Sequence, residues 1–388
     1  MRRERVRRQV AAWVALLSLL LWPASVPGQT RVLRAAARVA PDGSLADDGL
    51  IVIRDGTIAQ VGGEAPADIT IDDYPQAVLC PGLIDCRSTL GVLGGLGEHQ
   101  TAVQPNVRAA DAFDKYSPQL ATALQAGVMV FAIAPDDENL VGGRIAVCQT
   151  AGPDGRPRLL SETGPLKLSL SPDALKGDRE PTSRSGALGM LRDTLTAARE
   201  RPATADPLAA FAGGTLTGVL CAPSAADVMA GADLAEQFGL HLVVEHTNDA
   251  RLVAGDLGDH IAAVIVGPLG LHADRRAALA AGLFEKGGTP VAIAGGLPDT
   301  SPDSLRIGAA VACRAGLSAE AARRAITIVP ATVLGVSERI GSLEEKRQAD
   351  VVVFSGDPLD LRSRVLAVYV QGIRVFVADQ PAAQGDQP

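Results

Sequence analysis

A long central alternation of apolar runs and helical stretches constrains the fold of this 388-residue chain most. Apolar runs of strand length occupy residues 126–134, 241–246, 261–266 and 290–294, and segments with helical spacing follow them. Strands that alternate with helices are typical of repeated strand–helix units around a parallel sheet. The sequence therefore predicts an α/β protein with a large central parallel sheet.

The two ends of the chain carry hairpin patterns. Asp55-Gly56 lies between two strand-like runs, and Gln371-Gly372 lies between two more. Such pairs favour tight hairpins because both residues accept a positive φ. We expect the first and last segments to build one β domain with the central region inserted between them. The predicted boundaries are a β domain from residues 29–80 and 336–378, a barrel at 81–335 and a disordered tail at 379–388.

The first 28 residues read as an export signal. Residues 1–8 hold five Arg and one Glu, and the apolar stretch that follows, residues 10–22, is thirteen residues long. Small residues and a cleavage position after Gly28 complete the pattern. Spanning a bilayer takes about 20 apolar residues, so a retained anchor is the minor alternative. We predict an exported protein, periplasmic or extracellular, with no other membrane segment.

Composition limits which partners this chain can bind and which cysteine-based sites it can form. A net charge of −8 and only 3% aromatic residues argue against nucleic-acid binding, which needs positive charge and stacking surfaces. An odd number of cysteines leaves at least one thiol free, and their irregular spacing matches neither a disulfide scaffold nor a zinc knuckle. We expect most of them to be small buried side chains, with one bridged pair left open. The five are Cys80, Cys86, Cys148, Cys221 and Cys313.

Several sequence blocks in order point to one family. The run PGLIDCRST at residues 81–89 is followed by ALQAGVMVFAIAP, NLVGGRIAVCQTAG, DLAEQFGLHLVVEHTNDA and GSLEEKRQADVVVFSGDPLD. Together they resemble the metal-dependent amidohydrolase superfamily, in particular its branch related to imidazolonepropionase. The resemblance implies a (β/α)8 TIM barrel with a flanking composite β-sandwich domain formed by both termini. It also implies a site at the carboxyl ends of the barrel strands.

The resemblance identifies positions for metal ligands, and most of those ligands are missing. The superfamily's first strand ends in Ile-Asp-x-His-x-His, and its two histidine positions fall on Arg87 and Thr89. Arginine is a permanent cation, and threonine is a poor metal ligand. The His-Ala-His-like run of the fifth strand reads Cys-Ala-Pro from Cys221, whereas the sixth-strand histidine is retained as His246.

The remaining family positions also depart from the pattern. The eighth strand normally ends in a catalytic aspartate, but residues 294–297 contain no carboxylate, and Asp299 and Asp303 lie just beyond. Some relatives carboxylate a fourth-strand lysine to bridge two metals, and Lys167 falls in that region. Without the other ligands, we interpret Lys167 as an ordinary polar residue.

We therefore predict an exported amidohydrolase-fold protein that has lost metal binding and hydrolytic activity, a pseudoenzyme with no cofactor. A hydrolytic zinc site needs about three protein ligands and one open position. Arg87 would replace part of the missing positive charge and pair with a carboxylate or an anionic ligand. The predicted ligand is a small anionic or amide-like molecule. Its predicted binding residues are Arg87, Thr89, Cys221 and His246.

Two alternatives stay open. The first is an active metal-dependent hydrolase of non-peptide carbon–nitrogen bonds, amide or lactam, with zinc on displaced ligands such as Cys221, His246 and Asp299. The second is a structural subunit whose pocket is closed by side chains, and a homo-oligomer is compatible with each hypothesis. From the strand positions, we expect Glu245 to be buried against an Arg or Lys and Asp85 to make structural hydrogen bonds.

Overall fold

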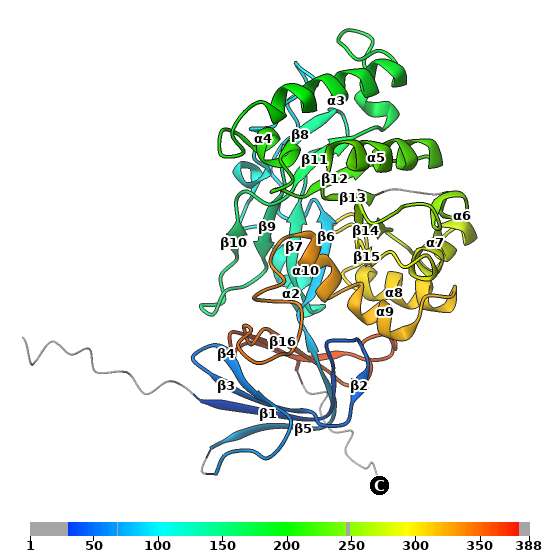
Figure 1. Ribbon diagram of the computed structural model, residues 1–388. Helices are drawn as coiled ribbons and strands as arrows, with labels where there is room; N and C mark the ends of the chain where they lie inside the picture. Colours follow the sequence, from blue (N-terminus) through cyan, green and yellow to red (C-terminus); the bar gives the residue numbers. More distant parts are fainter. Residues whose placement is uncertain (1–29, 68, 246–248, 380–388) are drawn as a thin grey trace, which may run out of the picture.

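The computed structural model describes residues 30–67, 69–245 and 249–379. The predicted export signal, residues 1–28, and the predicted ligand-binding residue His246 lie outside these ranges. The structure has an upper α/β part and a lower, strand-rich part that contains both ends of the described chain (Figure 1). No helix among the described residues is long and apolar enough to cross a membrane.

The lower part is an eight-stranded sheet to which both ends of the chain contribute. Its order is β18-β17-β16-β5-β1-β3-β4, with β2 paired to β1, and the antiparallel pairing of β16 with β5 joins the two ends. The strands are β1 (Arg31–Val39), β2 (Leu45–Ala46), β3 (Leu50–Arg54), β4 (Thr57–Val61), β5 (Ile71–Pro81), β16 (Val351–Phe354), β17 (Val365–Val370) and β18 (Ile373–Val377).

Both predicted hairpins are confirmed. Asp55 and Gly56, with φ of 51° and 76°, connect β3 to β4, and Gln371 and Gly372, with φ of 48° and 73°, connect β17 to β18. Positive φ at both central residues is the requirement of the type I′ turn, which matches the twist of the flanking strands. Local turn chemistry thus positions the outer strands of the sheet.

The upper part contains two further sheets. One has the order β10-β9-β7-β6, and the other has the order β15-β14-β13-β12-β11-β8. The pairs from β11 to β15 are all parallel, as is β6 with β7. The strands are β6 (Leu83–Ser88), β7 (Val128–Ile133), β8 (Val141–Arg144), β9 (Ala146–Gln149), β10 (Arg158–Ser161), β11 (Leu166–Ser169), β12 (Gly218–Cys221), β13 (Leu242–Glu245), β14 (Ile261–Val266) and β15 (Val291–Ile293).

The α/β class is confirmed, but the described residues form no closed sheet. The strands β8 and β9 belong to different sheets, and they run antiparallel to β11 and β7, respectively. Gly142 and Gly143 lie inside β8. The reversal follows from chain length, because only residues 134–140 separate β7 from β8 and a parallel crossover needs about a dozen residues.

Helices follow most of the parallel strands. Ser224 caps α5, its side chain accepting a hydrogen bond from the Asp227 backbone N–H, and Gly239 ends it at φ 60°. The helices are α2 (Gln119–Gln125), α3 (Arg184–Arg199), α4 (Pro207–Ala212), α5 (Ala225–Phe238), α6 (Ala250–Val253), α7 (Arg275–Lys286), α8 (Ser304–Arg314), α9 (Ala319–Arg324) and α10 (Ile328–Val333), with short 3₁₀ turns η1 (Ala109–Ala112) and η2 (Pro172–Ala174).

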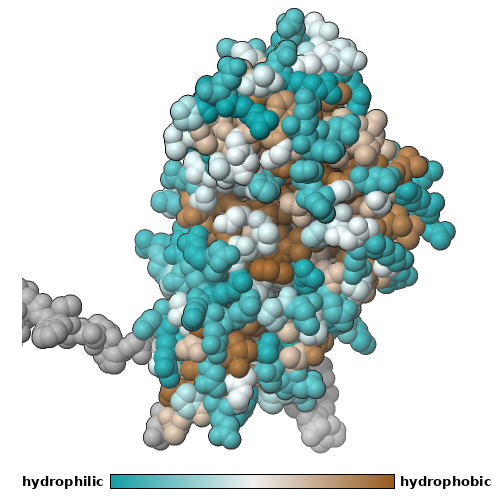
Figure 2. Space-filling model, viewed as in Figure 1, coloured by the Kyte–Doolittle hydropathy of each residue, from teal (hydrophilic) through white to brown (hydrophobic). Residues whose placement is uncertain are grey.

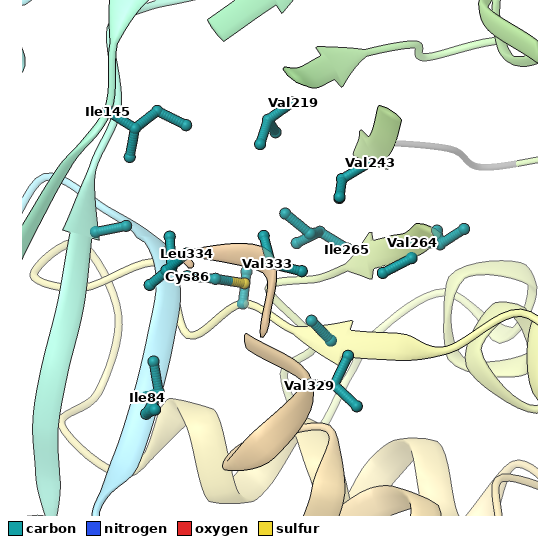
Figure 3. Close-up of a cluster of buried hydrophobic side chains, with 14 of the residues drawn as sticks. Ile84, Cys86, Ile145, Val219, Val243, Val264, Ile265, Val329, Val333 and Leu334 are labelled. Carbon is teal, nitrogen blue, oxygen red and sulfur yellow. The ribbon is translucent and has the colours of Figure 1, made fainter. Parts of the chain in front are cut away.

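The short helix α10 packs against the ends of the strands and helps to fill the core between them. Its Val329 and Val333 lie among side chains from β6, β12, β13 and β14 (Figure 3). On the face drawn in Figure 2, hydrophobic residues gather in a patch at mid-height, in the region where Figure 1 places α10, and hydrophilic residues cover much of the upper part. The core between the strands and α10 is therefore apolar, away from the carboxyl ends of the strands.

Candidate functional site

A cleft of about 370 Å³ opens at the carboxyl ends of the strands. This is the end at which α/β proteins place binding and catalytic groups. Its walls come from the end of β6 and the loop after it, the loop after β7, β11, η2 and the loop after β15. The lining residues are Arg87, Ser88, Thr89, Leu96, Ala134, Pro135, Asp136, Asp137, Glu138, Lys167, Asp173, Gly296, Leu297 and Asp299.

Lys167 forms the floor of this cleft. It lies on β11 and is only 1% exposed, and its Nζ is 2.7 Å from Asp137 Oδ1 and donates to Glu245 Oε1. Glu245, at the end of β13, is likewise 1% exposed. The prediction that Glu245 is buried against an Arg or Lys is confirmed. The interpretation of Lys167 as an ordinary polar residue is wrong, because its charge is enclosed between two carboxylates.

Arg87 completes an ion cluster with these three residues. Its Nη2 is 3.6 Å from Asp137 Oδ2, and its Nε is 3.6 Å from Glu245 Oε2. Each carboxylate therefore faces both cations, and the four ordinary charges cancel. Burying charge is tolerated only when the charges compensate one another in this way. We name Arg87, Asp137, Lys167 and Glu245 the floor cluster.

Asp85 links the first strand of the α/β part to the last. Its carboxylate is fully buried and accepts hydrogen bonds from the backbone N–H of Gly295 at 2.9 Å and of Arg87 at 3.1 Å, with Leu297 N at 3.5 Å. Burial raises the pKa of Asp85 to about 6, although these backbone donors pull it the other way. The predicted structural hydrogen bonds are present. The Thr89 N–H, which donates to Leu297 O at 2.8 Å, adds a second connection along the same seam.

The predicted ligand-binding residues fall in different places. Arg87 and Thr89 line the cleft, whereas Cys221 lies buried at the end of β12, near Asp137 and Glu245. Burial raises the pKa of the Cys221 thiol to about 12, so the thiol is protonated at neutral pH. All five cysteines are free, and Cys313 is the one that is not fully buried.

The resemblance implies a divalent metal ion, which would need donor atoms at the floor of this cleft. Asp137, Cys221 and Glu245 offer three donor atoms within 4.8 Å of one another. These donors do not fit a divalent ion, because Lys167 and Arg87 already neutralise both carboxylates and the thiol is protonated. A dication would add two positive charges to a neutral, largely buried cluster.

Other candidate ligands lie nearer the surface. A second group of donors, His99, Asp136 and Glu138, sits at the rim of the cleft with His99 Nε2 2.9 Å from Asp136 Oδ2. Asp299 lines the cleft but belongs to neither group of donors found among the described residues. Asp303 pairs with Arg306 at 3.3 Å, outside the residues that line the cleft.

Two residues of the floor cluster were missed by sequence reasoning. Asp137 follows β7 in a loop, and no spacing pattern connects it to Lys167 thirty residues later. The only available signal was that Lys167 interrupts an apolar strand, since a lysine there must find a buried partner.

Comparisons with known proteins agree with the resemblance to amidohydrolases and do not test the imidazolonepropionase branch. The model of the amidohydrolase family matches residues 236–385. A curated protein, amidohydrolase tasK of Hapsidospora irregularis, is 24% identical over 87% of this chain, and the alignment covers 41% of that protein's length. The chain therefore spans less than half of this relative.

Solved structures extend the likeness over most of the chain. The crystal structure of an amidohydrolase from Thermotoga maritima MSB8 aligns with a TM-score of 0.78 and 25% identity, over 89% of this chain and 100% of that one. A prolidase in complex with N-methylphosphonate-L-proline aligns with a TM-score of 0.59 and 17% identity, over 90% and 100%, which is a likeness of fold alone. The chain is therefore similar to amidohydrolases in its C-terminal part by the family model and over most of its length by the structure from Thermotoga maritima.

Proposed function

We propose that this chain is a hydrolase-like protein of the amidohydrolase superfamily whose cleft binds a small molecule without a hydrolytic metal. One observation carries the proposal: the Lys167 ammonium lies between the carboxylates of Asp137 and Glu245. The imidazolonepropionase branch, export and self-association remain predictions from the sequence.

The charges of the floor cluster explain why a metal is not expected there. Metal-dependent hydrolysis needs a cation that holds a water molecule and lowers the pKa of that water to about 7. A dication is attracted by surplus negative charge, but Arg87 and Lys167 leave none on Asp137 and Glu245. Carboxylation of Lys167 is disfavoured for a related reason, because it would place a third anion beside two carboxylates.

The alternative function is an active metal-dependent hydrolase of amide or lactam bonds. The three donors Asp137, Cys221 and Glu245 favour it, because their ligand atoms lie within 4.8 Å of one another. This alternative requires Lys167 to leave the cluster and Cys221 to lose its proton. Both changes oppose the charges observed, so we place it second.

Elemental analysis tests the proposal directly. The purified chain is incubated with zinc, manganese or iron, dialysed, and analysed for bound metal, and hydrolysis of dipeptides and simple lactams is measured with and without chelator. We expect well under one equivalent of metal and no chelator-sensitive turnover. Near-stoichiometric metal together with turnover that a chelator abolishes would overturn the proposal.

A paired substitution sharpens this test. Lys167→Met removes the central cation and gives the floor cluster a net negative charge, so the variant should take up more zinc than the unchanged chain. Lys286→Met is the matched control, because Lys286 is exposed in the last turn of α7 and does not line the cleft. Metal uptake that is equal in both variants would show that Lys167 does not exclude the ion.

A further inference from the structure

We infer that the ligand of this cleft is a cation, namely a small amphipathic amine or guanidine. This inference rests on the proposed binding function and adds the chemical class of the ligand. The argument depends on which charges in the cleft are already neutralised and which remain. The charged groups that line the cleft, together with their ion-pair partners, supply the count.

The floor of the cleft contributes no net charge. Arg87 and Lys167 are the cations among the lining residues, and both are paired with Asp137 and Glu245 at the distances given above. Arg87 therefore has little free charge with which to hold an anion. For this reason the structure favours a different ligand from the small anion that Arg87 suggested in the sequence.

The rim of the cleft is negative. It carries Asp136, Glu138, Asp173 and Asp299, of which Glu138 pairs with Lys176 at 2.5 Å and Asp136 contacts His99. The pairing with Lys176 lowers the pKa of Glu138, and Arg179 lies close enough to lower it further. This carboxylate is therefore charged at neutral pH.

Two rim carboxylates are left without a counter-charge. Asp173 and Asp299 are exposed and form no ion pair with any residue in the described part of the chain. The six carboxylates of floor and rim face four cations, Arg87, Lys167, Lys176 and the nearby Arg179, which leaves a net charge of −2 when His99 is not counted. A recess lined by one sign of charge concentrates its field and attracts the opposite charge.

The apolar part of the cleft wall indicates what the uncharged part of the ligand is. Leu96, Ala134, Pro135 and Leu297 line the same cleft as the carboxylates. Small-molecule sites combine such apolar walls with a few oriented polar groups. A ligand with a short hydrocarbon body and one ammonium or guanidinium group would satisfy both halves of this cleft.

Three probes of the same shape test the sign of the preferred charge. Hexylammonium, hexanol and hexanoate share a six-carbon chain, and their binding to the full chain is measured by calorimetry at low and moderate salt. We expect hexylammonium to bind tightest and its affinity to fall as salt rises. A preference for hexanoate, or no binding of any probe, would overturn the inference.

Substitution of the rim carboxylates tests whether they cause the preference for a cation. The double variant Asp173→Asn/Asp299→Asn should weaken hexylammonium binding by about fivefold or more, because it removes two negative charges that attract the ammonium group. Hexanol binding should not change. Asp178→Asn is the matched control, because Asp178 is exposed near Asp173 in the sequence but does not line the cleft. An equal loss in the control would refute the assignment to the rim.

A second measurement reports the local potential without any ligand. A Leu96→Cys variant, made in a Cys313→Ser background, is labelled with positively and negatively charged thiosulfonate reagents of similar size. The cationic reagent should react faster, and the Asp173→Asn/Asp299→Asn change should reduce that ratio. Equal rates would count against the inference. The metal analysis described above fails or succeeds independently of these results, so the two proposals can be told apart.

Discussion

The same strands of the α/β part supply two very different environments. Val243 of β13 lies in the apolar cluster around α10 (Figure 3). Glu245, two residues further on, lies in the floor cluster. On β12, Val219 belongs to the apolar cluster and Cys221 lies beside the carboxylates. Two residues span about 7 Å of a strand, so polarity reverses within that distance.

The amino ends of these strands differ from the carboxyl ends in the same way. A second hollow of about 300 Å³ begins near the amino ends of β12 to β15 and is lined by Val243, Val329 and Val333 among others. The apolar side chains that line this hollow need no hydrogen-bond or ion-pair partners, because burial alone stabilises them. The floor cluster, in contrast, is stable only as a set. The comparison teaches that the two regions should respond differently to single and paired substitutions.

The largest effect is expected for Lys167→Met. Removing one partner of a buried pair leaves a charge without compensation and typically costs about 3–5 kcal/mol. The free energy of unfolding, measured by urea denaturation, should fall by this order.

The double variant Lys167→Met/Glu245→Gln provides the control. It leaves Arg87 opposite Asp137, so it should recover much of the lost stability. If the double variant were no more stable than Lys167→Met alone, the loss would be one of packing, and the contrast with the apolar region would disappear.

A somewhat smaller effect is expected for Leu334→Ala in the apolar region. Leu334 follows α10 and is 3% exposed. Truncating a buried leucine costs about 2–5 kcal/mol through lost burial and the cavity left behind. Urea denaturation measures the loss, and binding of hexylammonium to the folded variant should be unchanged. A change in that binding would mean that the two regions are coupled.

The smallest effect is expected from pH. Burial raises the pKa of Asp85 to about 6, above its unfolded value, so its contribution to stability is present below about pH 4 and is lost as pH rises through 6. Asp350, whose pKa burial also raises to about 6, acts in the same direction. The loss for Asp85 is at most about 3 kcal/mol, because one pKa unit corresponds to about 1.4 kcal/mol.

Urea denaturation of Asp85→Asn between pH 4 and pH 7 measures this contribution. The stability advantage of the unchanged chain over the variant should shrink between about pH 4 and 6 and level off above. Asp178→Asn, which alters an exposed carboxyl, should show no such trend. A difference between the unchanged chain and Asp85→Asn that is constant across this range would contradict the prediction.

Local features were the ones that the sequence predicted well. The hairpins at Asp55-Gly56 and Gln371-Gly372 depend on neighbouring residues, so the residue types identify them. The burial of Glu245 followed from its place at the end of an apolar strand. Features that depend on distant pairing were missed, because no local pattern records them.

Two features show what local sequence patterns cannot predict. Lys167 and Glu245 are separated by 78 residues, so their contact arises from the order of strands rather than from any spacing. The reversed direction of β8 and β9 follows from the short loop before β8, because that loop is too short for a parallel crossover. The closed barrel that the resemblance implied is also not seen in the described residues.

The hydrogen bonds of Asp85 have a consequence for the architecture as a whole. Where the edge strands β6 and β15 approach each other, the Asp85 carboxylate accepts from the Gly295 amide, and the Thr89 amide donates to the Leu297 carbonyl. A backbone ladder cannot be edited by substitution, but a side chain can. The side-chain part of this connection can therefore be altered by one substitution, and the raised pKa of Asp85 also makes it sensitive to pH.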